Sequence, residues 1–167
     1  MKKLIINADD FGLHPLINKG IIEGYQKGMI TSTSIMPGAP CFREAANLAA
    51  QNSELGIGIH LTLVGGVAPV LKKGVNSLLT SHGVFAEDYT VFVKKWYTGS
   101  IKRSELEQEL RAQIEKVLES GIKPTHIDSH QHMHVLPGIA GMVIRLCREY
   151  GIRKIRMPEE NIFGQAG

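Results

Sequence analysis

Strand-like and helix-like segments alternate along this chain, and this alternation constrains the fold more than any other feature of the sequence. Short apolar runs rich in β-branched residues, such as KLIINA at residues 3–8 and GIGIHLTL at 56–63, are typical of buried strands. Strands that alternate with helices are joined by right-handed crossovers, which make the strands parallel. The sequence therefore predicts an α/β fold with a parallel-stranded sheet or barrel.

The helical segments carry apolar residues at the spacing of one helix face. The clearest helix is predicted to open at Ser104, because Ser104 and Glu107 have the spacing of a capping box, and to end at Gly121. Its apolar face consists of Leu106, Leu110, Ile114 and Val117. The other expected helices span residues 15–27, 41–52 and 137–150, and the expected strands span residues 3–8, 29–36, 56–63, 124–130 and 152–157.

Residues 64–100 are less regular and rich in glycine, so we expect a loop-rich insertion over the active-site face with a short helix near 88–97. Five strands are too few for an eight-stranded barrel, which takes about 250 residues. We expect residues 1–167 to form a single domain that is truncated at its C-terminus, an incomplete barrel of about five βα units. A complete open sheet of five strands is the structural alternative.

Charge and cysteine content exclude several classes of protein. The 19 basic and 16 acidic residues give a net charge of +3, and the basic residues are scattered, which disfavours a nucleic-acid partner. Cys41 and Cys147 are far apart and no CxxC is present, which disfavours a disulfide framework or a structural zinc site. Only three apolar residues follow the basic start of MKKLIINADD, too few for a signal peptide or a membrane span. The chain is predicted to be cytoplasmic, without a membrane partner.

Polar residues fall at the ends of three predicted strands. Asp9 and Asp10 follow the first strand, His60 lies in the third, and THIDSHQHMH at 125–134 closes the fourth. Ligands bind at the carboxyl ends of parallel strands, so these groups are expected to converge on one site. An isolated Asp-Asp pair is most often a turn or a cap, and an isolated histidine is most often a core residue. Their convergence favours a mononuclear metal site with two histidines and one carboxylate.

Strand geometry limits how many residues of THIDSHQHMH can bind one ion. Alternate residues of an extended strand lie about 6.6 Å apart, which would separate His126 from His134 by about 26 Å. One ion cannot bind the whole run, so its residues must have different roles. The polar residues before Pro137-Gly138 predict that the strand gives way to a loop near residue 130.

Four motifs in this order resemble those of the YdjC-like carbohydrate deacetylases, and the resemblance spans nearly the whole chain. The motifs are NADDFG at 7–12, GIHLTL at 58–63, THIDSHQHMH at 125–134 and RMPEE at 156–160, and the TSTS segment after the first helix matches as well. This group includes enzymes that deacetylate chitooligosaccharides. The resemblance implies a distorted (β/α) barrel related to the NodB-type polysaccharide deacetylases.

The resemblance also implies the site residues. Asp10, His60 and His130 are the expected metal ligands, Asp9 is the expected catalytic base, and Arg156 is the expected residue that orients the base.

The rest of the histidine run receives supporting roles. His126 and Asp128 are expected deeper in the strand, where they would fix the orientation and tautomer of the ligands. His132 and His134 are expected toward the pocket mouth or the loop, where they would contact substrate. Simple solvent exposure is an equal alternative for His134.

The implied activity is carbohydrate N-deacetylation, the hydrolysis of a linear amide C–N bond in sugars that contain N-acetylglucosamine. The resemblance implies one magnesium ion, whereas two histidines and a carboxylate also suit zinc or another transition metal. The metal would activate a water that Asp9 deprotonates. The expected partner is a small carbohydrate, and a homodimer is left open.

Relatives supply a further histidine from a late motif as the catalytic acid, and this sequence contains no such motif. A truncated chain, replacement of that acid by a residue such as His132, or an inactive protein would each account for this difference. Truncation is the favoured interpretation. The alternative function is a non-catalytic protein that binds metal or sugar.

Overall fold

The computed structural model describes residues 4–158, in which four parallel strands form one sheet in the order β1-β2-β3-β4. The strands are β1 (Asn7–Phe11), β2 (Ser32–Ile35), β3 (Gly56–Leu61) and β4 (Ile127–Ser129). Each strand pairs in parallel with the next one in the sequence, which confirms the predicted parallel α/β fold. Residues 159–160 of the RMPEE motif and the final NIFGQAG lie outside the described residues.

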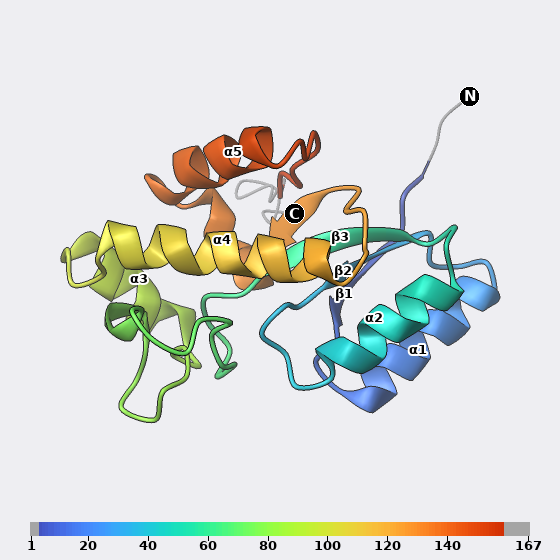
Figure 1. The fold of residues 1–167 in the computed structure, drawn as a ribbon, viewed down its shortest axis with the longest axis horizontal. Coiled ribbons are helices and arrows are strands. Elements are labelled where there is room, and N and C mark those ends of the chain that lie inside the picture. Colours follow the sequence, from blue (N-terminus) through green and yellow to red (C-terminus); the bar gives the residue numbers. More distant parts are fainter. Residues whose placement is uncertain (1–3, 159–167) are drawn as a thin grey trace, which may run out of the picture.

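The described residues form five α-helices. They are α1 (Pro15–Gln26), α2 (Phe42–Gln51), α3 (Tyr89–Tyr97), α4 (Arg103–Glu119) and α5 (Ile139–Glu149), with short 3-10 helices η1 (Asn76–Leu78) and η2 (His130–Val135). Figure 1 shows α1 and α2 side by side, α4 lying across the sheet and α5 above α4. None of the helices between residues 4 and 158 has the length and apolar character needed to cross a membrane.

The two faces of the sheet differ in chemistry. One face consists of fully or nearly fully buried apolar side chains that pack with the helices in the main core, among them Ile35, Ile57, Ile59, Leu61 and Ile127. Alternate positions of the same strands carry small or polar residues, namely Asn7, Asp9, Ser34, Gly58, His60 and Asp128. Successive side chains of a strand point to opposite faces, so these residues share the other face. These polar side chains, which include the predicted site residues Asp9, His60 and Asp128, therefore lie on the face of the sheet opposite the main core.

The first strand lies farther along the chain than predicted. It begins at Asn7, because β2 begins at Ser32 and leaves Leu4 and Ile5 with no neighbouring strand to pair with. The two aspartates consequently lie inside β1 rather than after it. The predicted fifth strand at 152–157 is also wrong, since it is reduced to a single parallel bridge between Ile127 and Ile155.

The start of α4 corrects another prediction. Lys102 is the N-cap residue and makes no side-chain capping bond, so Ser104 and Glu107 do not form the expected capping box. The helix start is instead bound to η1. The Ser77 N–H donates to the Glu105 carboxylate at 2.7 Å, and the Lys102 N–H donates to the Ser77 hydroxyl at 3.0 Å. A contact distant in sequence thus replaces the local cap.

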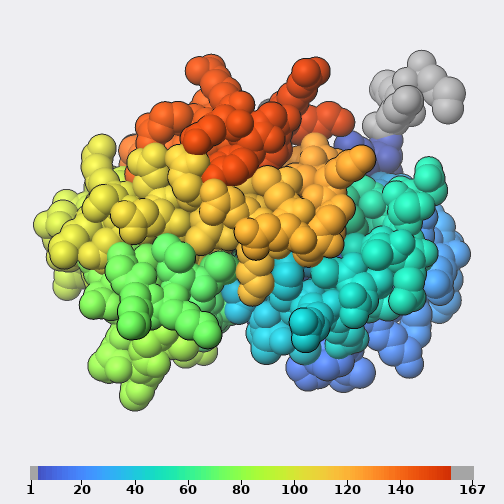
Figure 2. All heavy atoms as spheres, viewed as in Figure 1, coloured from blue at the N-terminus to red at the C-terminus, as the bar shows by residue number. Residues whose placement is uncertain are grey.

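The segment from 64 to 100 contains η1 and α3 and is otherwise irregular, as its composition predicts. Figure 2 shows part of it, in green, as a lobe beside α4. Two fully buried side chains of α4, Glu109 and Gln113, bind the backbone of this region. The Glu109 carboxylate accepts hydrogen bonds from the N–H groups of Val70 (2.8 Å) and Leu71 (3.0 Å). Gln113 pairs with both backbone polar groups of Thr62, at 2.7 and 2.8 Å, directly after β3.

Replacing Glu109 with alanine should lower the free energy of unfolding by about 2–4 kcal/mol, because two backbone N–H groups and the Gln113 amide would lose their acceptor. Urea unfolding measures this change. Glu119→Ala, at an exposed position of the same helix, is the control and should stay within about 0.5 kcal/mol of the parent protein. Equal stabilities of the two variants would show that Glu109 does not anchor the insertion.

Candidate metal centre

An irregularity in β1 brings the adjacent side chains of Asp9 and Asp10 into the same site. The pairing of β1 with β2 shifts register between Ala8 and Phe11, and Asp10 adopts a left-handed conformation with a φ of 65°. Neighbouring residues of a regular strand would point to opposite faces. A left-handed conformation costs a non-glycine residue about 1–2 kcal/mol, so other contacts must hold Asp10 in place.

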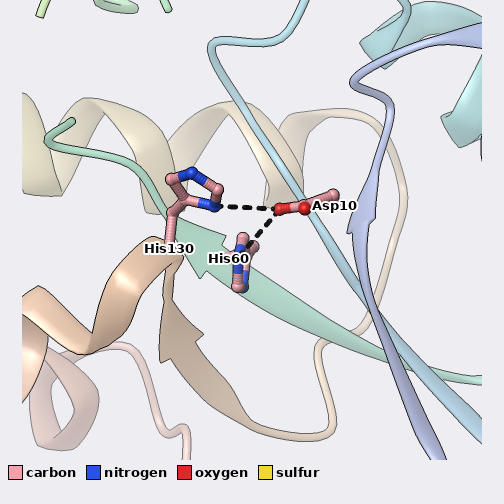
Figure 3. A group of neighbouring side chains, drawn as sticks. All are labelled: Asp10, His60 and His130. Carbon is pink, nitrogen blue, oxygen red and sulfur yellow. Dashed lines mark hydrogen bonds and ion pairs between the residues drawn. The ribbon is translucent and has the colours of Figure 1, made fainter. Parts of the chain in front are cut away.

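Two histidines supply those contacts (Figure 3). The Asp10 Oδ1 lies 3.3 Å from His60 Nε2, on β3, and 3.0 Å from His130 Nδ1, at the start of η2. The three candidate ligand atoms all lie within 4.8 Å of one another. Two ligands that are each about 2.1 Å from one ion lie about 3–3.5 Å apart in octahedral or tetrahedral geometry. The distances from Asp10 Oδ1 to the two histidine nitrogens, 3.3 and 3.0 Å, are in the range expected for ligands of one divalent ion.

The charges of the three groups also fit a cation. Hydrogen bonds with His130 and His60 hold the pKa of Asp10 far below its usual range. Burial lowers the pKa of His60, but its hydrogen bonds to Asp10 and Asp128 outweigh this effect and raise the pKa to about 9. His60 thus takes up a proton between two carboxylates. A divalent ion would satisfy the same negative charge, with both imidazoles neutral.

Asp128 holds His60 in the orientation that a ligand requires. This fully buried carboxylate accepts a hydrogen bond from His60 Nδ1 at 2.7 Å. Because Nδ1 carries the proton, the lone pair of a neutral His60 is on Nε2, the atom that faces Asp10. Asp128 therefore lies where the sequence predicted a supporting residue.

A second group of candidate ligand atoms, from Asp9, His60 and Asp128, overlaps the first. In this second group, the positive charge that would balance the two carboxylates already comes from an arginine side chain. Arg156 Nη1 donates to both oxygens of Asp9, at 2.8 and 2.9 Å, and lies 3.4 Å from Asp128 Oδ2. No arginine or lysine of the described residues pairs with Asp10, so the group formed by Asp10, His60 and His130 is the better candidate for a metal.

His126 lies one layer below the candidate ligands. Its ring packs directly over Gly58, where an added Cβ would lie 2.3 Å from Nε2, and its Nδ1 pairs with the Thr125 hydroxyl at 2.9 Å. Burial lowers its pKa. His126 directly precedes β4, which begins at Ile127, instead of lying inside the strand as predicted. Among the described residues His126 makes no hydrogen bond to His60 or Asp128.

The strand ends at Ser129, which confirms the predicted change near residue 130. Gln131 and His132 are both left-handed, with φ of 51° and 58°. The Nδ1 of His132 is buried and has no hydrogen-bond partner among the described residues. His132 therefore has a buried polar atom without a partner among the described residues, two positions after the candidate ligand His130.

Both predicted surroundings of His134, the pocket mouth and simple solvent exposure, are wrong, because the residue is only 3% exposed. Its Nδ1 pairs with the Ser129 hydroxyl at 2.6 Å, and its Nε2 donates to the backbone carbonyl of Arg156 at 2.8 Å. His134 thus holds the segment that carries the arginine. The sequence pattern does not reveal this role, because alternation alone cannot show how a 3-10 helix turns a side chain inward.

Sequence reasoning missed three residues at the site. Asn7 Nδ2 donates to Asp9 Oδ1 at 2.7 Å, and the Ser34 hydroxyl contacts both Asp9 and Asp128. Gly65 leaves room for the His130 ring, since an added Cβ would lie 2.9 Å from its Nε2. Asn7 and Ser34 belong to NADDFG and TSTS, so the motifs included them without indicating their contacts.

Comparison with known proteins adds independent findings. Residues 3–167 match the sequence family described as YdjC-like protein. A carbohydrate deacetylase of Clostridium beijerinckii is 42% identical over 150 residues, covering 90% of this chain and 58% of that protein. A carbohydrate deacetylase of Geobacillus stearothermophilus is 36% identical over 167 aligned positions, covering 95% of this chain and 64% of that protein.

A crystal structure is also similar. It belongs to an Enterococcus faecalis protein provisionally described as a cellobiose-phosphate cleavage protein, and it superposes with a TM-score of 0.85 at 36% identity. The match covers 96% of this chain and 60% of that one. The chain thus spans about three fifths of the length of the proteins that it matches.

Gly65→Ala should weaken binding of a divalent metal at least about tenfold, because the new methyl group would displace the His130 ring. Titration with Zn²⁺ against a chromophoric chelator measures the affinity. Gly66→Ala is a matched control: Gly66 is also left-handed, with a φ of 69°, but nothing lies within 4 Å of an added Cβ. Both variants should lose about 1–2 kcal/mol of stability from backbone strain. Equal metal affinities would exclude His130 as a ligand.

Proposed function

Because this chain belongs to the YdjC-like carbohydrate deacetylase family, we propose that it carries the metal site and the catalytic base of an enzyme that removes N-acetyl groups from sugars containing N-acetylglucosamine. The proposal rests on one observation above all. Asp10, His60 and His130, a group that could hold a metal ion, lie beside a separate carboxylate, Asp9, that is held by an arginine. Amide hydrolysis by a metal-activated water needs this combination of ligands and base.

The roles of the side chains follow from their contacts. Asp10, His60 and His130 would hold the ion, which supplies Lewis acidity when bound and makes water a stronger nucleophile. Asp9 would take the proton of the attacking water, and Arg156 keeps the Asp9 carboxylate oriented through two hydrogen bonds. Asp128 keeps the lone pair of His60 directed at the ion.

The identity of the ion and of the sugar is part of the proposal. Family resemblance favours magnesium, whereas the two imidazole ligands favour zinc or another transition metal. Metal analysis of the purified protein, together with activity after chelation and reloading, distinguishes these ions. We propose a small, chitooligosaccharide-like substrate and a cytoplasmic location, in line with the same resemblance.

Acetate release from N-acetylglucosamine oligomers by the metal-loaded protein tests the proposal. A metal-loaded protein that releases no acetate would overturn it and would support the alternative, a protein that binds metal or sugar without turnover. Treatment with a chelator should abolish the release, and reloading with the native ion should restore it.

Asp9→Asn should lower kcat by at least about 10²-fold while metal affinity stays within about threefold, because the amide keeps the shape of the carboxylate but cannot take a proton. Asp10→Asn is the matched variant of the neighbouring residue and should lose both metal affinity and turnover, since Asp10 lies against both histidines. Turnover that survives Asp9→Asn would refute the assignment of the base.

A further inference from the structure

Ser34 is a fully buried serine on β2 whose hydroxyl lies between two carboxylates of the site. Its Oγ is 3.0 Å from Asp128 Oδ2 and 3.3 Å from Asp9 Oδ1. The same oxygen accepts a hydrogen bond from Asn7 Nδ2 at 3.2 Å. The Ser34 side chain makes no hydrogen bond to Asp10, His60 or His130 among the described residues, so its polar influence on the site passes through these two carboxylates.

A serine hydroxyl has one proton to donate, and here two acceptors compete for it. The second donor shared by Asp9 and Asp128 is Arg156 Nη1. Two like charges side by side repel each other, and the shared arginine offsets this repulsion. The Ser34 hydroxyl donates its proton to one carboxylate at a time, with Asp128 the nearer acceptor. Of the two donors that Asp9 and Asp128 share, Arg156 is charged and Ser34 is uncharged.

The hydrogen bonds of Asp9 are distributed unequally between its two oxygens. Oδ1 lies within hydrogen-bond distance of three donors, the side chains of Asn7, Ser34 and Arg156. Oδ2 receives a hydrogen bond from Arg156 alone among the described residues. A carboxylate oxygen has two lone pairs, so Oδ2 keeps one for an incoming proton. Ser34 and Asn7 therefore determine which oxygen of Asp9 can act as the base.

Asp128 is hydrogen-bonded to both Ser34 and His60, so Ser34 can affect the orientation of the candidate ligand His60. Asp128 Oδ1 accepts from His60 Nδ1 at 2.7 Å, while Oδ2 lies against Ser34 at 3.0 Å. A carboxylate whose two oxygens are both bound cannot rotate freely about its last bond. Ser34 thus fixes the plane of Asp128, and with it the direction of His60 Nε2.

We propose that Ser34 is a positioning residue that aligns the catalytic base and a metal ligand at the same time. Its hydroxyl presents Oδ2 of Asp9 to the attacking water and holds Asp128 against His60. This inference rests on the proposed deacetylase function for its effect on turnover, but not for its effect on metal affinity. The two effects can therefore be measured separately.

Zn²⁺ affinity in the absence of sugar is the first readout. Ser34→Ala should weaken Zn²⁺ binding about tenfold, since the Asp128 carboxylate would keep His60 and the longer contact with Arg156 but lose its 3.0 Å partner on Oδ2. Ser34→Cys, which keeps the shape but is a weaker donor, should also weaken it, and this variant carries the test if the alanine variant does not fold. Ser34→Thr keeps the hydroxyl and should retain the affinity of the parent protein within about twofold.

Ser32→Ala is the matched control. Ser32 is also buried, lies on the same face of β2 two residues earlier, and has no side-chain hydrogen bond among the described residues. It should leave Zn²⁺ affinity unchanged. A merely structural role of β2 serines would weaken binding in both alanine variants, which would contradict the proposal.

Turnover is the second readout. Ser34→Ala saturated with metal should lower kcat about 10–100-fold with KM within about twofold, because the base is misaligned while the sugar contacts remain. Asn7→Ala should lower kcat more than it lowers Zn²⁺ affinity, since Asn7 donates directly to Asp9 and is linked to Asp128 only through Ser34.

Unchanged Zn²⁺ affinity in both Ser34→Ala and Ser34→Cys would overturn the proposal, and so would an equal loss in Ser34→Thr. A parent protein that binds no Zn²⁺ would also overturn it. If the parent protein binds Zn²⁺ but releases no acetate, the proposed function fails, while the affinity comparison still decides the role of Ser34.

Discussion

Three carboxylates at one end of a parallel sheet impose the constraint on which the rest of the site depends. Asp9, Asp10 and Asp128 repel one another, and each must have a positive or hydrogen-donating partner before the chain can fold around them. Arg156 serves Asp9 and Asp128, while the two histidines serve Asp10. The polar face of the sheet is thus organised by charge balance, and a divalent ion would complete that balance.

Long periodic elements and the convergence of motifs could be predicted from the sequence. The α4 face of Leu106, Leu110, Ile114 and Val117 is fully buried, as its spacing indicates. The meeting of Asp10, His60 and His130 follows from the rule that parallel strands end at the same edge. In both cases the sequence pattern is regular, and few other folds would satisfy it.

Features that depend on distant contacts could not be predicted. No pattern in NADDFG reveals that Asp10 is left-handed, because two histidines far along the chain stabilise that conformation. The cap of α4 was mispredicted because Ser77, distant in sequence, replaces the local serine. Likewise, the burial of His134 depends on a carbonyl 22 residues away. The roles of Ser34 and Asn7 could not be predicted for the same reason.

The hydrogen bond from His134 to the Arg156 carbonyl has a thermodynamic consequence. It joins η2, which begins with the candidate ligand His130, to the segment whose side chain holds Asp9. A shift of η2 that improves ion coordination therefore also changes the free energy of aligning the base. Coupling of this kind is reciprocal: the factor by which ion binding changes the affinity for a ligand that contacts Asp9 and Arg156 is the factor by which that ligand changes the affinity for the ion. Occupancy of one position would then depend on occupancy of the other.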